Sequence, residues 1–200
     1  MENTVDRRRR WKILRSEYYV RRPWMTSRKD CVEYEDGRMN EEYWVLEYPE
    51  WVNVIAITNE GKMVMERQYR HGAGLTSYEL PCGVVESGES PLSAGKRELE
   101  EETGYGGGEW IKLMELYPNP GSQTNCSHSY LALGVEKLCA PHLDTTEELE
   151  VYLLDQSYVK ALLNDNQIVQ ALMAGPLYKY FYDEDLKELI SKMTRQKEGQ

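Results

Sequence analysis

The stretch GVVESGESPLSAGKRELEEETGY, residues 83–105, decides the fold of this chain. Ser90 is a favourable N-cap residue, and Pro91 suits the first helical position because its missing N–H would have no partner within the helix. Gly104 suits the left-handed position just beyond a helix C-terminus. The stretch therefore predicts a helix over residues 91–103 that follows a glycine-containing loop.

The acidic side chains of this helix are spaced so that they meet. Glu98, Glu101 and Glu102 stand three and four residues apart, and such positions project from one face of a helix. Adjacent like charges destabilise a helix, and a divalent cation that prefers oxygen ligands, Mg²⁺ or Mn²⁺, would offset this. The alternative is a solvated acidic face on a surface helix, which is the usual meaning of a run of glutamates.

Residues at fixed offsets around the acidic triad favour the metal interpretation. Gly83, Glu89 and Arg97 complete the pattern glycine, five residues, glutamate, seven residues, then R-E-U-x-E-E-x-G-U, where U is a bulky apolar residue. This pattern resembles the signature of the Nudix hydrolases, with Tyr105 in the last apolar position. The resemblance implies an α/β fold, a mixed sheet held between helices as an α/β/α sandwich, and hydrolysis of nucleoside diphosphates linked to another group.

The resemblance also implies roles for the residues of the signature. Glu98, Glu101 and Glu102 would bind the metal ion, together with the backbone carbonyl of Cys82. Arg97 would pair with a carboxylate, such as Glu89, and hold it in place, and we count Arg97 and Glu101 among the catalytic residues. An ordinary surface ion pair is the alternative for Arg97, and such pairs stabilise little.

The length and charge of the chain limit the remaining classes. Two hundred residues suit one domain with a small appendage. A net charge of −10 argues against nonspecific nucleic-acid binding as the main activity. Residues 1–30 nevertheless carry ten basic residues against four acidic ones. Such an arm is typically a solvated terminus, and phosphate binding is the alternative.

The cysteines and apolar runs indicate a cytoplasmic protein without a membrane segment. Cys31, Cys82, Cys126 and Cys139 form no CxxC pair, which disfavours a zinc site and fits reduced thiols. His128 lies in a strand-like run and reads as a packed residue. No signal peptide and no apolar stretch of about eighteen residues is present.

Period-two and turn patterns divide the chain. We expect a tail over residues 1–16, strands in the rest of an N-terminal β-subdomain (1–47), a Nudix domain (48–192) and a frayed tail (193–200). Further strands are predicted at 51–57, 63–69, 110–117, 129–135 and 151–154, with a flexible break at 106–108. Helices are predicted at 158–164 and 166–174, and Gly175-Pro176 is expected to interrupt the helical region.

Motifs outside the signature resemble the ADP-ribose pyrophosphatase branch of the family. Arg67 and Arg70 lie in an R-Q-Y-R strand end, where the resemblance implies contact with substrate phosphate. The segment Y-E-L-P-C-G leads into the signature as in that branch, and Pro120 follows Tyr105 at the branch's spacing. Asn125 stands near the place where the branch often has an acid, so the sugar preference is left open.

The general base is expected on an acidic loop after the signature. In the resembled branch the base comes from such a loop, and here Glu147 is the first candidate and Glu148 the second. A loop carboxylate can close over the site after substrate binds. Solvated loop acids without a catalytic role are the alternative.

Aromatic residues of the N-terminal subdomain are candidates for contact with the base of the nucleotide. Trp24 and Trp44 would stack on adenine as in related enzymes, although most tryptophans in such segments only pack. The resembled branch completes its site across two subunits, so a homodimer is expected.

The function predicted from the sequence is Mg²⁺-dependent hydrolysis of ADP-ribose or a related ADP-sugar to AMP and a sugar phosphate. One alternative is another nucleotide sugar, such as a GDP-hexose, or a general nucleoside diphosphate derivative. A nucleotide-sugar sensor that binds without cleaving is a different class, and the complete acidic triad argues against it.

Overall fold

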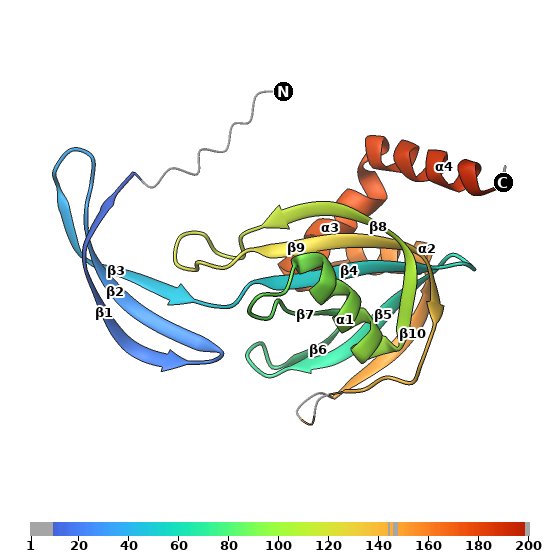
Figure 1. Ribbon diagram of the computed structural model, residues 1–200, viewed down its shortest axis with the longest axis horizontal. Coiled ribbons are helices and arrows are strands. Elements are labelled where there is room, and N and C mark those ends of the chain that lie inside the picture. Colours follow the sequence, from blue (N-terminus) through green and yellow to red (C-terminus); the bar gives the residue numbers. More distant parts are fainter. Residues whose placement is uncertain (1–9, 144, 146–147, 199–200) are drawn as a thin grey trace. The chain divides into compact units, whose positions relative to one another are not determined.

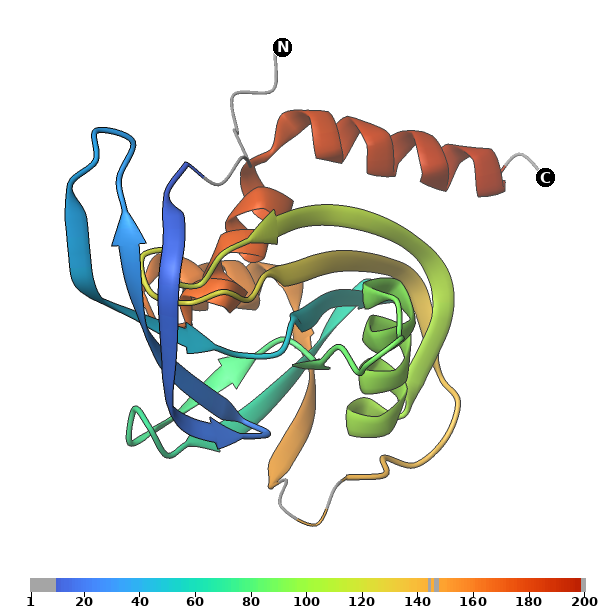
Figure 2. The same cartoon turned by 60° about the vertical axis from the view of Figure 1, so that its left-hand side comes forward.

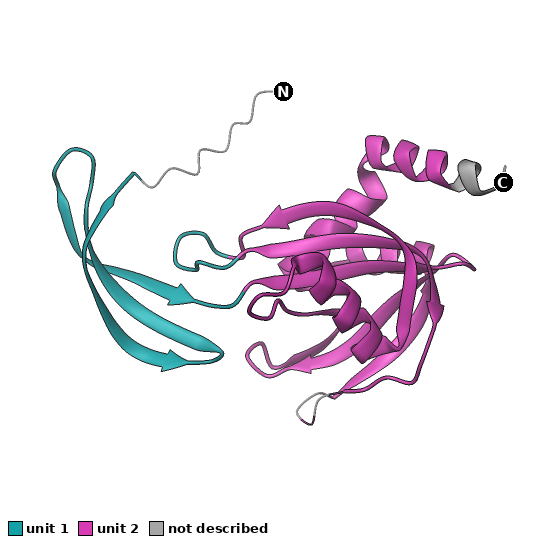
Figure 3. Ribbon diagram, viewed as in Figure 1, with its two compact units in different colours: residues 1–49, 119–125 teal, residues 50–118, 126–200 magenta. Residues whose placement is uncertain are grey.

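The chain folds into two compact units, shown in Figure 3. The structure is a computed structural model and describes residues 10–143, 145 and 148–198, with the side chains of 194–198 left undescribed. Unit 1 comprises Met1–Pro49 and Asn119–Asn125, and unit 2 comprises Glu50–Pro118 and Cys126–Gln200. The sequence did not indicate that a loop from the middle of the chain belongs with the N-terminal residues.

Unit 1 is an antiparallel sheet with the strand order β1-β2-β3. Its strands are β1 (Lys12–Arg22), β2 (Met25–Glu33) and β3 (Met39–Glu47). The predicted break at Arg22-Pro23 is confirmed, whereas the tail predicted through residue 16 is wrong because β1 already begins at Lys12. The segment 119–125 attaches to β3 through two backbone hydrogen bonds of Leu46, which donates to Ser122 (2.7 Å) and accepts from Thr124 (3.1 Å).

Unit 2 is built on a mixed seven-stranded sheet with the order β10-β5-β4-β9-β8, to which β6 adds on β5 and β7 adds on β4. β4 and β9 run parallel, and the other pairs run antiparallel. The strands are β4 (Trp51–Thr58), β5 (Lys62–Arg70), β6 (Leu75–Glu79), β7 (Cys82–Val84), β8 (Tyr105–Leu116), β9 (Ser127–Lys137) and β10 (Leu149–Asp155).

Helices cover both faces of the sheet in unit 2. α1 (Pro91–Thr103) lies on one face, α2 (Gln156–Asn164) and α3 (Ala171–Tyr182) lie on the other, and α4 (Glu184–Glu198) follows α3 (Figures 1 and 2). Fully buried residues such as Ile55, Leu131 and Met173 form the core between the sheet and α2–α3. The expected α/β fold class, a mixed sheet between helices, is confirmed.

The Gly175-Pro176 pair does not end a helix, contrary to the prediction. It lies inside α3. Proline has no N–H for the carbonyl four residues earlier, here that of Leu172. The side chain of Asn53 on β4 supplies the missing donor, with its Nδ2 3.1 Å from the Leu172 oxygen. A buried tertiary hydrogen bond therefore lets the helix continue through proline.

Two further local predictions are wrong. The helix predicted over 166–174 is replaced by a turn with Asn166 at φ 54°, and α3 starts only at Ala171. Residues 106–108 are part of β8 rather than a flexible break. Gly108 has φ 73°, and a Cβ there would lie 2.6 Å from the carbonyl oxygen of Leu133, so glycine permits the close strand approach.

At the C-terminal end, α4 continues to Glu198, beyond residue 193 where a frayed tail was predicted. Every helix among the described residues is too short or too polar to span a bilayer. The four cysteines are all free thiols.

Candidate active site

The predicted helix of the signature is present with both of its caps. Ser90 has extended backbone and its Oγ accepts a hydrogen bond from the N–H of Ser93 at 3.1 Å. Gly104 is left-handed at φ 69° and donates its N–H to the Glu100 carbonyl at 2.7 Å. The caps therefore fix α1 at the residues that the sequence indicated.

The acidic triad divides between two environments. Glu98 and Glu102 lie one turn apart on the buried side of α1, at 8% and 4% exposure. The side chain of Glu101 is 49% exposed and accepts a hydrogen bond from Nη1 of Arg97 at 3.0 Å. The expectation that all three share one face thus holds for Glu98 and Glu102, whereas Glu101 faces solvent.

Arg97 connects the helix to the loop before it. Its guanidinium donates to both carboxylate oxygens of Glu89, at 3.2 and 3.1 Å, and to the Val84 carbonyl at 3.0 Å. It also lies 2.9 Å from Oε1 of Glu98. The hydrogen bonds with Glu89 raise the pKa of Arg97 and lower the pKa of Glu89. The expected pairing of Arg97 with Glu89 is present.

The glycine at the start of the signature makes room for a carboxylate. A Cβ on Gly83 would lie 2.1 Å from the carboxylate of Glu98, so any side chain would displace it. The preceding residue, Cys82, donates its backbone N–H to Oε2 of Glu102 at 2.8 Å. β7 thereby brings the Cys82–Gly83 peptide directly against both buried glutamates.

Two buried acids that the sequence analysis missed lie beside the helix. Glu66 on β5 and Glu79 on β6 are directly opposite in register, and both are 1% exposed. Burial raises the pKa of Glu102 well above its usual range, and the neighbouring charge of Glu66 raises it further. The signal in the sequence was an acid placed directly after the buried run Met63-Val64-Met65.

The two arginines of the R-Q-Y-R segment point to opposite faces of the sheet. Arg70 shares the α1 face with Glu66 and donates to Glu79, with Nη2 2.7 Å from Oε2. Strand alternation places Arg67 on the other face, where it contacts Tyr152. The structure therefore brings Arg70, but not Arg67, to the face that carries the glutamates.

The remaining predicted residues lie in or near loops. Glu147 is outside the described residues. Glu148 is exposed and directly precedes β10.

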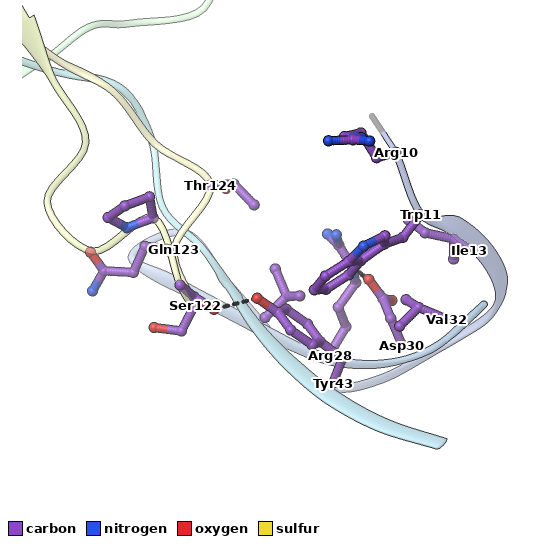
Figure 4. Close-up of a pocket in the computed structure, with 13 residues that line it drawn as sticks. Arg10, Trp11, Ile13, Arg28, Asp30, Val32, Tyr43, Ser122, Gln123 and Thr124 are labelled. Atoms are coloured by element: carbon purple, nitrogen blue, oxygen red, sulfur yellow. Dashed lines mark hydrogen bonds and ion pairs between the residues drawn. The ribbon is translucent and has the colours of Figure 1, made fainter. Parts of the chain in front are cut away.

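Unit 1 contains a cavity of about 630 Å³, shown in Figure 4. Trp11 and Tyr43 form aromatic walls, and the ion pair of Arg28 with the buried Asp30 lies among its lining side chains. Pro120 lines the cavity, as do neighbouring residues of the 119–125 segment.

The two tryptophans expected to stack on the nucleotide base do not line this cavity. Trp24 is 69% exposed, and Trp44 packs against Tyr19 with ring centroids 5.0 Å apart. Their exposure leaves Trp24 and Trp44 available for a ligand, while Trp11 and Tyr43 are the aromatic residues that the structure places around a hollow.

Comparison with known proteins identifies the class. A NUDIX domain model matches residues 48–171, and the chain therefore belongs to the Nudix family. It is a Nudix pyrophosphohydrolase. Relatives named as ADP-ribose pyrophosphatases place it with the ADP-ribose pyrophosphatase-like branch.

Individual relatives agree with this assignment. The chain is 33% identical to the ADP-ribose pyrophosphatase of Bacillus subtilis (strain 168), over 72% of this chain and 77% of the relative. It is 40% identical to the methanol dehydrogenase activator of Bacillus methanolicus, over 54% of this chain and 58% of the relative. A crystal structure of an ADP compounds hydrolase shares the fold, with a TM-score of 0.73 at 20% identity, covering 90% of this chain and 98% of that one.

Nudix hydrolases generally use divalent metal ions, and the donor set of unit 2 fits one. In the part of the chain that the structure describes, no three His, Cys, Asp or Glu side chains converge as a formed metal site. The buried oxygens of Glu66, Glu98 and Glu102 nevertheless concentrate negative charge beside the Cys82–Gly83 peptide. Clustered carboxylate oxygens are the hard donors that a divalent cation prefers.

Proposed function

We propose that this protein hydrolyses the pyrophosphate bond of ADP-ribose or a related ADP-sugar, giving AMP and a sugar phosphate, with Mg²⁺ as the cofactor and Mn²⁺ as a substitute. The observation that carries the proposal is the burial of Glu98 and Glu102 against Gly83, with Glu66 adding a third carboxylate nearby. The relatives named as ADP-ribose pyrophosphatases support the choice of substrate.

The residues of unit 2 have distinct roles in this proposal. Glu98, Glu101, Glu102 and the carbonyl of Cys82 hold the metal, which when bound neutralises the pyrophosphate and lowers the pKa of a coordinated water. Arg97 keeps the loop and the helix together through its bonds to Glu89 and Val84.

Contact with substrate phosphate is assigned to Arg70. Its side chain is 30% exposed and lies on the α1 face, whereas Arg67 points to the opposite face. A guanidinium is suited to phosphate because its planar donors can bind two oxygens at once.

Glu147 is the proposed general base and Glu148 the second candidate. We expect Glu147→Gln or Glu148→Gln, but not both, to remove most of the rate at saturating metal. Rates close to wild type in both variants would show that the loop acids are bystanders.

Unit 1 is proposed to bind the nucleoside part of the substrate. Trp24 and Trp44 offer exposed aromatic surface for stacking on a base, and Pro120 would approach the substrate from the 119–125 loop. A second copy of the chain would complete the site, so a homodimer is proposed. The four free thiols suit the reducing cytoplasm.

The deciding experiment incubates the purified full chain with Mg²⁺ and a panel of ADP-ribose, other ADP-sugars, GDP-hexoses and simple nucleoside diphosphates. We expect AMP and ribose 5-phosphate from ADP-ribose at the highest kcat/KM. Preferred cleavage of a GDP-hexose would redirect the substrate assignment, and tight binding without phosphate products would indicate a sensor.

A further inference from the structure

A buried histidine at one end of the sheet in unit 2 contacts two carboxylates. His128, second in β9, is 7% exposed. Its Nε2 lies 3.0 Å from Oε2 of Glu50, and its Nδ1 lies 3.5 Å from Oε1 of Glu115. Glu115 is also paired with Lys112, with Nζ 2.5 Å from Oε1. The imidazole is therefore the centre of a cross-strand contact.

The three residues joined by this ring mark the places where the chain passes between the two units. Glu50 is the first residue of unit 2 after Pro49. Glu115 lies near the end of β8, shortly before the chain enters the 119–125 segment, and His128 lies just after its return at Cys126. One side chain thus contacts all three segments of unit 2 that lead into or out of unit 1.

Glu50 also holds the loop that carries the signature glycine. Its carbonyl accepts a hydrogen bond from the N–H of Val85 at 2.9 Å. Directly after it, β4 pairs with β7, with Val52 opposite Gly83. On the other side of the loop, Arg97 donates to the Val84 carbonyl. The segment Gly83–Val85 is therefore fixed between the start of β4 and α1.

We propose that His128 is a positioning residue for the Gly83–Val85 segment and acts through Glu50. The contact fixes Glu50, the residue directly before β4, and with it the Glu50–Val85 hydrogen bond. This role goes beyond the proposed function, since neither residue touches the substrate or the metal ligands.

The alternative is a histidine that only packs in the core. The two interpretations predict different responses to substitution. The Glu50 side chain is 55% exposed, so its loss leaves no buried charge and costs little stability. Packing alone would make every variant at His128 loosen the whole sheet. Positioning through Glu50 makes one amide, that of Val85, respond selectively.

The test is amide hydrogen exchange of the full chain by NMR, which needs neither metal nor substrate. We expect His128→Leu to speed exchange of the Val85 amide by about tenfold, the size expected when a hydrogen bond to a charged group is lost. Amides of β10 and α2, far along the chain, should stay protected. Glu50→Ala should reproduce the effect, and the double variant should add nothing to it.

Two controls keep the result interpretable. His128→Gln retains an amide donor toward Glu50 and should restore most of the protection of Val85. His142→Leu removes an exposed imidazole elsewhere and should change nothing. Unchanged protection of Val85 in both His128→Leu and Glu50→Ala, or equal loosening of β10 and α2, would overturn the proposal.

Steady-state kinetics provide a second test of the role of His128, and this test rests on the proposed function. With ADP-ribose and Mg²⁺, His128→Leu should lower kcat about tenfold and leave KM nearly unchanged, because a displaced loop misplaces the reacting groups. If wild-type protein cleaves no substrate, the proposed function fails while the Val85 measurement still decides the role of His128. A lower kcat without a Val85 effect would count against positioning through Glu50.

Discussion

Each unit buries carboxylates, and the two units neutralise them differently. In unit 1, Asp30 receives hydrogen bonds from Arg28 (3.0 Å) and from the Ser16 hydroxyl (2.6 Å), and Arg28 also pairs with Glu47. In unit 2, Glu66 and Glu102 lie beside each other. Two arginines contact acids in this region: Arg70 bonds to Glu79, and Arg97 bonds to Glu89 and also lies 2.9 Å from Oε1 of Glu98.

The difference separates a buried acid paired with its own arginine from a cluster in which several buried acids lie together. A buried carboxylate with its own arginine is electrostatically complete and contributes through the geometry it fixes. Burial raises the pKa of Glu102, and the charge of the adjacent Glu66 raises it further. Removing the arginine of the first arrangement would leave a buried acid unpaired in unit 1, whereas the gathered acids of unit 2 offer the oxygen ligands that a divalent cation prefers.

The largest expected effect is on the glutamate cluster of unit 2. Glu102→Gln keeps the shape of the side chain but removes a ligand charge, so kcat should fall by a factor on the order of 10³. The fold should persist because the variant also removes a buried repulsion. Turnover is measured with ADP-ribose and Mg²⁺, and thermal unfolding without metal provides the control. Turnover equal to wild type would refute the assignment of Glu102 as a ligand.

The compensated pair should respond in stability rather than in chemistry. Arg28→Met leaves Asp30 buried without its cation and should cost about 3 kcal/mol in the unfolding free energy of unit 1. Hydrogen exchange of the β2 amides measures this. The matched control is Arg15→Met, which breaks an exposed pair with Glu41 at 3.7 Å and should cost under about 1 kcal/mol. Equal losses in the two variants would contradict the comparison.

The unfolding free energy of unit 2 should depend on pH through Glu102. Because the pKa of Glu102 is raised in the folded state, its contribution to stability is complete below about pH 4.3, the unfolded value, and is lost as pH rises through the folded pKa. The unfolding free energy of metal-free wild type should therefore fall as pH rises from about 4.3 through the folded pKa of Glu102. In Glu102→Gln it should fall less.

Urea unfolding in a chelator at a series of pH values measures this dependence. Stabilisation by added Mg²⁺ should grow with pH, because the ion binds the deprotonated carboxylate. Identical pH dependence of wild type and Glu102→Gln would show that Glu102 does not carry the repulsion.

The smallest expected effect concerns the exposed aromatic surface of unit 1. Trp24→Ala should raise KM for ADP-ribose about tenfold, the loss of one stacked base, and change the unfolding free energy by under about 0.5 kcal/mol. Trp11→Ala is the matched variant, since Trp11 packs on Tyr34 at 4.5 Å and should lose stability. A larger change in stability than in KM for Trp24→Ala would indicate packing.

Much of unit 2 could be predicted because its signals are local. Ser90, Pro91 and Gly104 set the ends of α1, and glutamates one turn apart define its buried side. The Nudix family followed from fixed spacings in one segment. In the R-Q-Y-R segment, period-two alternation already separates Arg67 from Arg70, although the motif alone treats them alike.

The features that escaped prediction depend on residues far apart in the chain. Glu66 joins the site only because β5 and α1 meet across the fold. Pro176 lies within a helix because Asn53, more than one hundred positions earlier, supplies a donor to Leu172. The glycines at 106–108 suggest a break in the sequence, and the close approach of Leu133 to Gly108 is visible only in the folded chain. No window of sequence contains these partners.

The interleaved path of unit 1 has a consequence for protein engineering. A chain trimmed to begin at Glu50 would keep residues 119–125 but lose Tyr43 and Leu46, whose hydrogen bonds anchor that loop. In such a shortened protein, the crossover between β8 and β9 would lack these anchoring hydrogen bonds. Exchanging the amino-terminal strands between homologues therefore requires moving this crossover with them, as a matched set.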